Sequence, residues 1–254
     1  MDNRFDSPQY VPTLERVKAV IEQKAWYGYD EQTGAFDLSK SIRKIIDSLE
    51  GFTGLEDQVR EAFESSYTPD CLTTVQSEAD GQAIRLPLVA AIGQLGLEQF
   101  IWTVGDTDYQ RLKFTRSTTS DYIDNEHYYC VPADKFSELR KILGGLKTRE
   151  RIQDMQVIIV DDKDVQTHRV KEMAPEYNEN QEGRKAFNVS EYYINLKDPN
   201  ANAQAFYEFV LKFRQENSQT ELVLILDFDG VVADTNSVIT GPVAEKLTML
   251  LLTL

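Results

Sequence analysis

The feature that most constrains this chain is a series of short apolar segments in its second half, separated by polar turns and by stretches with helical periodicity. The apolar segments are residues 99–104, 127–131, 157–160, 192–196 and 222–226. Strands that alternate with helices build βαβ units, and such units give a parallel sheet with helices on both faces. The sequence therefore predicts an α/β fold, a Rossmann-like parallel sheet of about five strands.

The apolar segment nearest the end of the sequence, 222–226, leads directly into the carboxylates Asp227 and Asp229. Side chains alternate along a strand, so we expect these two carboxylates to face the same side. Two acids that close repel each other unless a cation lies between them or one is protonated. Gly230 allows a sharp turn next. Ligands of parallel sheets bind beyond the carboxyl ends of the strands, so this stretch predicts a functional site.

The region before the first apolar segment has a different pattern. Residues 1–11 are polar, and we expect them to form a loose leader. Apolar residues at helical spacing predict helices beyond them, at 14–25, 38–49, 53–63 and 87–95. Asp37 is the expected N-cap of the second helix. No strand pattern interrupts residues 12–95, so we expect a helical block here.

Composition excludes several classes of function. A net charge of −15 argues against nucleic acid and anionic membranes as partners, because both favour clustered Lys and Arg. Acidity favours recruitment of metal cations, although a solvated acidic surface has the same composition. The two cysteines, Cys71 and Cys130, indicate neither a disulfide framework nor a zinc site, and the reducing cytoplasm is the expected compartment. Residues 1–6 lack the apolar core of a signal peptide, and the apolar stretch 247–254 is too short to span a bilayer.

The string Asp-x-Asp-Gly-Val-x-x-Asp-Thr, residues 227–235, resembles the first motif of the haloacid-dehalogenase-like (HAD) phosphohydrolases. The resemblance implies that Asp227 is a nucleophile that forms an aspartyl-phosphate and that Asp229 is the general acid/base. Carboxylates perform both tasks in enzymes. The plainer interpretation is a polar turn after a core strand. A kinase-like string is the weaker alternative, because the glycine-rich loop and the other kinase motifs are absent.

A second stretch, residues 102–106 followed by Gln110 and Lys113, resembles the second HAD motif and its following helix. The resemblance implies that the Thr103 hydroxyl donates a hydrogen bond to the transferring phosphoryl group. An ordinary β-branched strand residue is the alternative for Thr103.

Lys135 lies shortly after the predicted strand 127–131 and just before a helical pattern, which resembles the third HAD motif. The resemblance implies a cation that offsets the charge of carboxylates and phosphate. A solvated lysine in the first turn of a helix is the alternative. Lys113 and Lys147 are competing candidates for the same task.

Asp161 and Asp162 follow the β-branched segment 157–160, and this resembles the fourth HAD motif, whose acids hold Mg²⁺. Magnesium prefers oxygen ligands and is held by one or two carboxylates together with water and substrate phosphate. The resemblance implies Mg²⁺ bound by Asp227, Asp162 and the 228–229 backbone, with Asp161 and Asp229 completing the candidate metal set. A structural alternative is that one of these acids caps the next helix.

Gln166 is a departure from the family pattern, because many members carry another acid about four residues after the first. Asp161 or Asp164 is a candidate replacement. The other possibility that this departure raises is a metal held by fewer ligands, and we would then expect weaker activity. Two other groups fail as sites: His127 and His168 lack the spacing of a metal pair, and the thiol of Cys130 is expected to be buried and inert. The aromatic stretch 26–29 is expected to pack as a loop rather than to line a pocket.

The HAD-like motifs occur in the order two, three, four, one, and circular permutation would explain this order. It predicts that the strand at 222–227 lies between the strands at 99–104 and 157–160. Residues 87–240 would form the core and residues 12–86 a helical cap, with 241–254 as a candidate completion of that cap. A truncated or fused gene is the alternative explanation.

The expected function is that of a Mg²⁺-dependent phosphomonoester hydrolase acting on a small phosphorylated metabolite. A phosphotransferase or mutase of the same family is the enzymatic alternative. A catalytically silent, phosphate-sensing or partner-binding relative is the other alternative, favoured by Gln166 and the motif order. The sequence leaves the substrate and the oligomeric state open.

Overall fold

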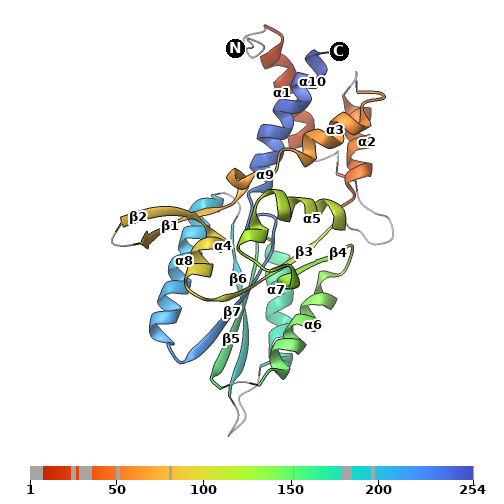
Figure 1. Ribbon diagram of the computed structural model, residues 1–254. Helices are drawn as coiled ribbons and strands as arrows, with labels where there is room; N and C mark the ends of the chain where they lie inside the picture. Colours follow the sequence, from red (N-terminus) through yellow and green to blue (C-terminus); the bar gives the residue numbers. More distant parts are fainter. Residues whose placement is uncertain are drawn as a thin grey trace.

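The computed structural model describes residues 8–23, 27–28, 36–49, 52–79, 82–150, 152–178, 185–195 and 198–253. Its centre is a five-stranded sheet with strand order β4-β3-β7-β5-β6 (Figure 1). The strands are β3 Glu98–Val104, β4 Tyr128–Val131, β5 Asp154–Asp161, β6 Phe187–Tyr193 and β7 Thr220–Leu226. All four neighbouring pairs are parallel. The predicted α/β class with a Rossmann-like parallel sheet is confirmed.

Strand β7 is the last strand in the sequence and the middle strand in space. Leu226 lies opposite Ile101 of β3 on one side and opposite Val160 of β5 on the other. Residues 222–226 are all buried, which explains their unbroken apolar run, since a central parallel strand is covered on both faces. The predicted position of this strand between 99–104 and 157–160 is confirmed.

Alternate residues of β7 enter two separate hydrophobic cores. Leu224 packs in a core that includes residues of α4 (Leu88–Gln94), α5 (Thr107–Arg116) and α8 (Pro199–Glu216). Val223 and Ile225 pack in the other core, with residues of α6 (Lys135–Thr148) and α7 (Asp164–Met173). The sheet is therefore covered by helices on both faces, and its polar residues can emerge only at its edges and strand ends.

Segments from the two ends of the sequence pack together beyond one end of the sheet (Figure 1). The helices are α1 Tyr10–Glu22, α2 Leu38–Ser48, α3 Glu56–Glu64, α9 Thr235–Val238 and α10 Ala244–Leu252, with a π-helical turn at Ile239–Val243. Helix α10 runs beside α1 and contacts α3. The tail that follows β7 thus joins the N-terminal helices, as we expected of residues 241–254.

An antiparallel hairpin interrupts the region that we expected to be wholly helical. It consists of β1 (Thr74–Ala79) and β2 (Gln82–Pro87), so the prediction of an uninterrupted helical block over 12–86 is wrong. Strand β1 is mostly polar, and the alternation in β2 is limited to Ile84 and Leu86 around Arg85, so the pattern that marks a strand is short. Side chains of α8 complete β1: Asn200 Oδ1 accepts from Thr74 N at 2.9 Å, and Gln204 Oε1 accepts from Gln76 N at 2.7 Å.

Several predicted boundaries also shift. Helix α1 begins at Tyr10, inside the expected leader, of which residues 1–7 lie outside the described residues. Strand β6 covers 187–193 rather than 192–196, and residue 196 is likewise not described. In the aromatic stretch 26–29 only 27–28 are described. The N-cap prediction is confirmed, because Asp37 accepts a hydrogen bond from Lys40 N at 2.9 Å.

Candidate functional site

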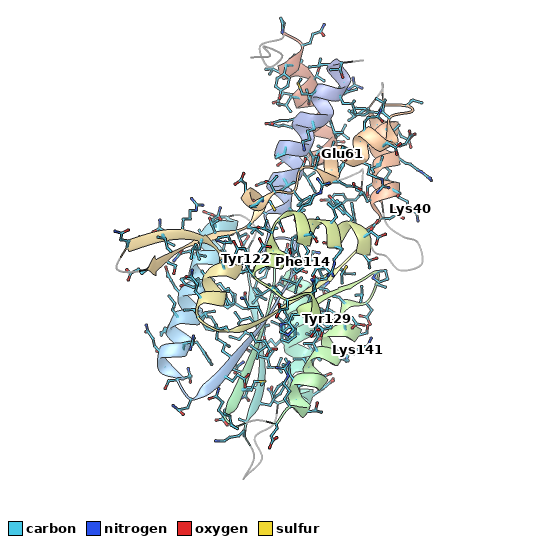
Figure 2. The ribbon with its side chains drawn as sticks, in the orientation of Figure 1. Lys40, Glu61, Phe114, Tyr122, Tyr129 and Lys141 are labelled. Carbon is cyan, nitrogen blue, oxygen red and sulfur yellow. The ribbon has the colours of Figure 1, made fainter. Side chains whose placement is uncertain are left out.

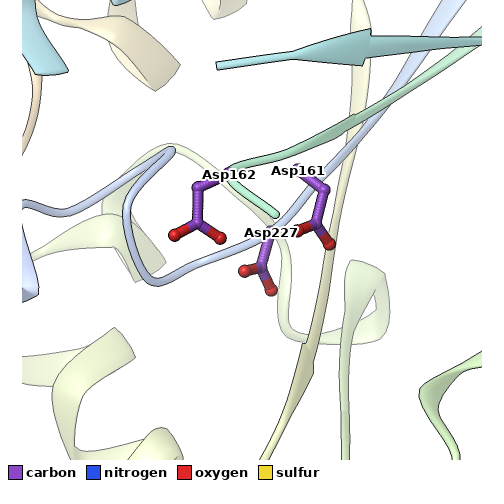
Figure 3. Close-up of side chains that lie close together, drawn as sticks. All are labelled: Asp161, Asp162 and Asp227. Atoms are coloured by element: carbon purple, nitrogen blue, oxygen red, sulfur yellow. The ribbon is translucent and has the colours of Figure 1, made fainter. Parts of the chain in front are cut away.

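Three carboxylates meet where β5 and β7 end. Asp161 is the last residue of β5, Asp162 follows it, and Asp227 follows the last residue of β7. One carboxylate oxygen from each lies within 4.8 Å of the others (Figure 3). Two neighbouring parallel strands bring Asp227 next to Asp161 and Asp162, although more than sixty positions separate it from them in the sequence. We refer to Asp161, Asp162 and Asp227 as the acidic cluster.

Lys135 is bound into the acidic cluster. Its Nζ donates to Asp161 Oδ2 at 2.5 Å and to Asp227 Oδ1 at 3.2 Å. It begins helix α6, and its Nζ also lies 4.1 Å from the centre of the Trp102 ring. The competing candidate Lys147 lies elsewhere, with its Nζ 5.8 Å from the Tyr177 ring centre. Lys135 is therefore a cation that is hydrogen-bonded within this cluster, and it lies at the position that the sequence indicated.

The three acids differ in how many of their oxygens are already engaged. Both oxygens of Asp161 accept hydrogen bonds, Oδ2 from Lys135 and Oδ1 from Lys163 N at 2.9 Å. Asp162 Oδ1 is buried and accepts none within the described part of the chain. Asp227 uses Oδ1 for Lys135, and no described residue donates to its Oδ2. Asp161 thus orients Lys135 and the start of α7, while Asp162 and Asp227 keep oxygens for another ligand.

This donor set fits a hard divalent cation. A buried carboxylate oxygen without a partner costs free energy unless a cation or a proton satisfies it. Asp162 and Asp227 together offer two carboxylates, which is the protein contribution that Mg²⁺ commonly uses. The acidic cluster is therefore the candidate metal centre.

Electrostatics within the cluster lead to the same assignment. Burial raises the pKa of Asp227 to about 7, against the opposing effect of Lys135, and Asp161 and Asp162 raise it further. Burial also raises the pKa of Asp162 to about 6, with Lys163 acting in the opposite direction. Without a metal these two groups retain protons well above the usual range of a carboxylic acid. A divalent cation would stabilise the ionised forms.

The carboxylate of Asp229 lies outside the acidic cluster. Its Oδ1 accepts from Lys113 Nζ at 2.5 Å and from the Thr235 hydroxyl, and its Oδ2 accepts from Gln110 Nε2 at 2.9 Å. Burial alone would raise the pKa of Asp229, but Lys113 and the hydrogen bonds of Thr235 and Gln110 lower it to about 2. Asp229 is therefore ionised and satisfied without a metal.

We expected the Asp229 carboxylate to face the same side as that of Asp227, but it is not part of the acidic cluster. The place of Asp229 in the metal set, which the resemblance gives to its backbone, stays a prediction. Strand β7 ends at Leu226, so strand alternation no longer governs the residues beyond it. Gly230 has a φ of +85°, which lets the chain turn back, and Val232 N donates to Phe228 O at 3.1 Å. This turn directs the Asp229 carboxylate toward helix α5.

Lys113 is a site residue that the sequence presented only as a competitor of Lys135. Its side chain is 2% exposed, and its Nζ lies 5.3–5.4 Å from the ring centres of Tyr67, Tyr109 and Phe228. A usable signal was present, because Gln110 and Lys113 are spaced i, i+3 and so lie on one face of a helix. The sequence did not indicate that this face of the helix binds Asp229.

Thr103 lies in β3, the strand next to β7, one residue before the strand ends. It is 1% exposed and is opposite Cys130 of β4. No described residue forms a hydrogen bond with its hydroxyl. Its location at the carboxyl end of a neighbouring strand agrees with the predicted role, but no contact joins it to the acidic cluster.

The other candidates lie outside the acidic cluster. Asp164 is the exposed first residue of α7 and is not part of it, and Gln166 Oε1 is buried without a partner in the described part of the chain. His127 Nε2 lies 3.4 Å from Glu98, on the β3–β4 side of the sheet. Cys130 is a free cysteine of intermediate exposure rather than the buried one we expected, and burial raises the pKa of its thiol to about 11, which disfavours the reactive thiolate.

Known proteins offer no assignment for this arrangement: no family model, no curated protein and no solved structure matches the chain. Among the helices of the described residues, none is long and apolar enough to cross a membrane. A Rossmann-like fold hosts many unrelated functions. The function therefore has to be argued from the acidic cluster with Lys135 and from the Asp229–Lys113 pair.

Proposed function

We propose that this protein is a Mg²⁺-dependent phosphomonoester hydrolase that forms an aspartyl-phosphate on Asp227, in the manner of the HAD phosphohydrolases that its motifs resemble. The observation that carries the proposal is the meeting of Asp227, Asp162, Asp161 and Lys135 at the carboxyl end of the central strand. Each of the four comes from a stretch that resembles a HAD motif. Lys135 and the acids come from three separate elements, so a chance polar turn after one strand does not account for the arrangement.

In the first step Asp227 acts as the nucleophile. A carboxylate oxygen gives an electron pair to phosphorus, and the bond from phosphorus to the leaving oxygen breaks with its electrons on that oxygen. Lys135 offsets the charge that accumulates, and Asp161 holds the Lys135 ammonium at 2.5 Å. Thr103, whose hydroxyl has no hydrogen-bond partner among the described residues, would donate to a phosphoryl oxygen.

Asp227, Asp162 and the backbone at 228–229 would hold Mg²⁺, which neutralises the phosphoryl oxygens and keeps the carboxylates ionised when it is bound. Asp162 Oδ1, which has no hydrogen-bond partner in the described part of the chain, and the raised pKa of Asp227 support this assignment. Asp161 already binds Lys135 and Lys163 N, so we assign it to positioning rather than to the metal.

Asp229 completes the reaction. In the second step it takes a proton from the water that attacks the aspartyl-phosphate, which releases phosphate and regenerates the Asp227 carboxylate. Three hydrogen bonds keep Asp229 ionised, the form that a base needs, and its side chain is 31% exposed, so water can reach it. In the first step Asp229 would protonate the leaving oxygen. To do so it must first carry a proton itself, and that proton takes the place of one of the hydrogen bonds that the carboxylate now accepts.

In this proposal the chain is a permuted HAD-like protein. The central position of β7 between β3 and β5 supports it, since the motif-one strand of a permuted chain must return to the middle of the sheet. Helices α1, α2, α3 and α10 would serve as a cap that limits water and selects the substrate, a small phosphorylated metabolite. A phosphotransferase or mutase would use the same residues with an acceptor other than water.

A catalytically silent phosphate-binding protein is the second candidate. Gln166 favours it, because a neutral amide stands where many relatives carry another acid and its Oε1 is buried without a partner in the described residues. Such a protein would bind Mg²⁺ and phosphate at the acidic cluster without turnover.

Phosphate release from an aryl phosphate in the presence of Mg²⁺ tests the proposal. The unmodified protein should release phosphate, and Asp227→Asn should lower the rate by at least about 10⁴-fold, because an amide is not a nucleophile for phosphorus. Asp164→Asn is the matched control, since Asp164 is an exposed acid outside the cluster, and its rate should stay within about twofold. Turnover that survives in Asp227→Asn would contradict the mechanism. Absence of turnover on a broad panel of phosphates, with Mg²⁺ still bound, would favour the silent protein.

A further inference from the structure

Lys113 is a buried cation to which the reaction described above gives no part beyond its hydrogen bond to Asp229. Its side chain is 2% exposed, and lysines are almost never buried to this extent unless they are paired. Its charge partner is Asp229, whose Oδ1 lies 2.5 Å from Nζ. The two residues come from α5 and from the loop after β7, so the pair joins elements more than a hundred positions apart in the sequence.

Aromatic rings enclose the Lys113 ammonium on its remaining sides. Ring centres of Tyr67, Tyr109 and Phe228 lie 5.4, 5.3 and 5.4 Å from Nζ. Ring faces attract a cation without competing for a specific hydrogen-bond direction, and burial strengthens that attraction. The rings therefore restrict where Nζ can lie and leave Asp229 as its charged acceptor.

The carboxylate is held from more than one direction. Thr235 donates to the same oxygen as Lys113, and Gln110 donates to Oδ2 at 2.9 Å. Gln110 and Lys113 lie on one face of α5, so a single rigid helix grips both oxygens. A carboxylate oxygen has two lone-pair directions, so Oδ2 keeps one for a water molecule.

We propose that Lys113 is a positioning residue that holds Asp229 in the orientation from which it takes a proton from the attacking water. This inference rests on the proposed function and concerns the second step, the breakdown of the aspartyl-phosphate. The hydrogen bond of Lys113 goes to Asp229 and not to a carboxylate of the acidic cluster. Lys113 acts by fixing the direction of the remaining Oδ2 lone pair. That direction is fixed because the other three lone-pair directions of the carboxylate accept hydrogen bonds from Lys113, Thr235 and Gln110.

The alternative is that Lys113 only stabilises the packing of α5 against the loop after β7. The two roles predict different kinetics. Both roles allow a loss of stability, but a loss of packing alone would lower kcat/KM and give no burst of product. A loss of positioning slows the second step alone, so the aspartyl-phosphate accumulates, kcat and KM fall by the same factor, and kcat/KM stays the same.

The test uses Lys113→Met, which preserves length and removes the charge, with 4-nitrophenyl phosphate as substrate. Its leaving group needs little protonation, so the first step hardly depends on Asp229. We expect kcat and KM each to fall by about 10- to 100-fold, part of the 10²–10⁴-fold contribution of a general base. A rapid burst of about one nitrophenolate per enzyme should precede the slow turnover. Lys113→Arg should recover part of kcat, because it restores a cationic donor.

Lys141→Met is the matched control. Lys141 forms an ion pair of the same length, 2.5 Å to Glu138, but its side chain is 70% exposed on α6 (Figure 2). Its burst and kcat should match those of the unmodified protein. If Lys113→Met does not fold, Lys113→Gln keeps a neutral donor and should give the same burst with a smaller fall in kcat.

A double variant decides between the two roles. In Asp229→Asn the Lys113→Met change should add less than about twofold to the loss of kcat, since the residue through which it acts is already gone. Independent, multiplicative losses would overturn the inference, as would a fall in kcat/KM without a burst. The proposed function fails separately, if the unmodified protein does not turn over 4-nitrophenyl phosphate or if Asp227→Asn retains its activity, and the positioning role falls with it.

Discussion

Asp227 and Asp229 are two positions apart and lie in opposite electrostatic environments. Asp227 is buried beside two other acids and shares one lysine with Asp161, and its pKa is raised to about 7. Asp229 has Lys113 as its own ion-pair partner and two further donors, and its pKa is lowered to about 2. The number of donors for each carboxylate, and not its place in the sequence, decides which of the two is ionised.

The contrast separates two tasks within one site. The acidic cluster has three carboxylates, more negative charge than Lys135 and the neighbouring Lys163 offset, so it needs an added cation. The Asp229 group is complete and needs none. Asp227, which needs a metal to be ionised, and Asp229, which is ionised without one, can therefore lie close together in the sequence. Each binds a lysine from a different helix, Asp227 that of α6 and Asp229 that of α5.

The largest expected effect concerns metal affinity and the division of labour inside the cluster. Asp162→Asn should weaken Mg²⁺ binding by at least about 100-fold, because it removes a ligand, whereas Asp161→Asn should weaken it by about 10-fold, as loss of a supporting contact does. Calorimetric titration of each variant with Mg²⁺ measures both. Equal losses would show that Asp161 is a ligand as well. Asp229→Asn should retain most of the affinity, and a loss as large as that of Asp162→Asn would break the contrast between the two carboxylates.

The next effect compares two ion pairs of equal length. Lys113→Met should lower the free energy of unfolding at pH 8 by about 2 kcal/mol, since it leaves Asp229 without the partner of a mostly buried pair. Lys141→Met should change it by less than about 0.5 kcal/mol, because its pair with Glu138 is exposed. Urea denaturation measures both values. Similar losses for the two variants would mean that burial does not strengthen the dependence on Lys113.

The smallest effect concerns the free energy of unfolding without metal. Replacing Asp227 and replacing Asp229 by asparagine should change it in opposite directions. The folded-state pKa of Asp227 is raised, so ionising it costs stability as the pH rises from about 4 through about 7. Asp227→Asn should therefore be more stable than the unmodified protein at pH 8. The gain in the free energy of unfolding should be at least about 1 kcal/mol, because the raised pKa of a buried carboxyl disfavours its ionised form by that much or more. The gain should disappear near pH 4.

Asp229 should behave in the reverse way. Its folded-state pKa is depressed, so it contributes stability above its unfolded value of 3.8, and this contribution is lost as the pH falls toward about 2. Asp229→Asn should therefore be less stable than the unmodified protein at pH 8. Thermal unfolding of both variants at pH 4 and pH 8, with EDTA present, measures the two trends. Changes of the same sign at pH 8 would contradict the contrast.

Much of the sheet was predictable because its strands are buried. The run 222–226 had to be apolar to lie in the middle of a parallel sheet, and its central place between 99–104 and 157–160 followed from the order of the motifs. Asp161, Asp162 and Lys135 were predictable site residues for a related reason. Each stands where a strand ends or a helix begins, and the parallel direction of the strands brings those positions to one edge.

The hairpin β1–β2 was not predictable because its stability comes from distant residues. Strand β1 carries few apolar side chains, and Asn200 and Gln204 of α8 accept hydrogen bonds from its backbone. No local pattern in residues 74–87 reports the presence of those amides. A polar strand whose second edge is completed by side chains from a helix looks, in sequence, like a loop or the end of a helix.

The sequence by itself determined which apolar segments form the central sheet, that this sheet is parallel, and that Asp227 follows a buried strand, because burial on both faces demands apolar runs that are recognisable locally. Only the tertiary structure decided the partner of each carboxylate. The turn at Gly230, at a φ of +85°, sends Asp229 to Lys113, whereas Asp227 remains with Lys135. Ion pairing depends on distances of a few ångströms between separate helices, and those distances arise only when the elements pack.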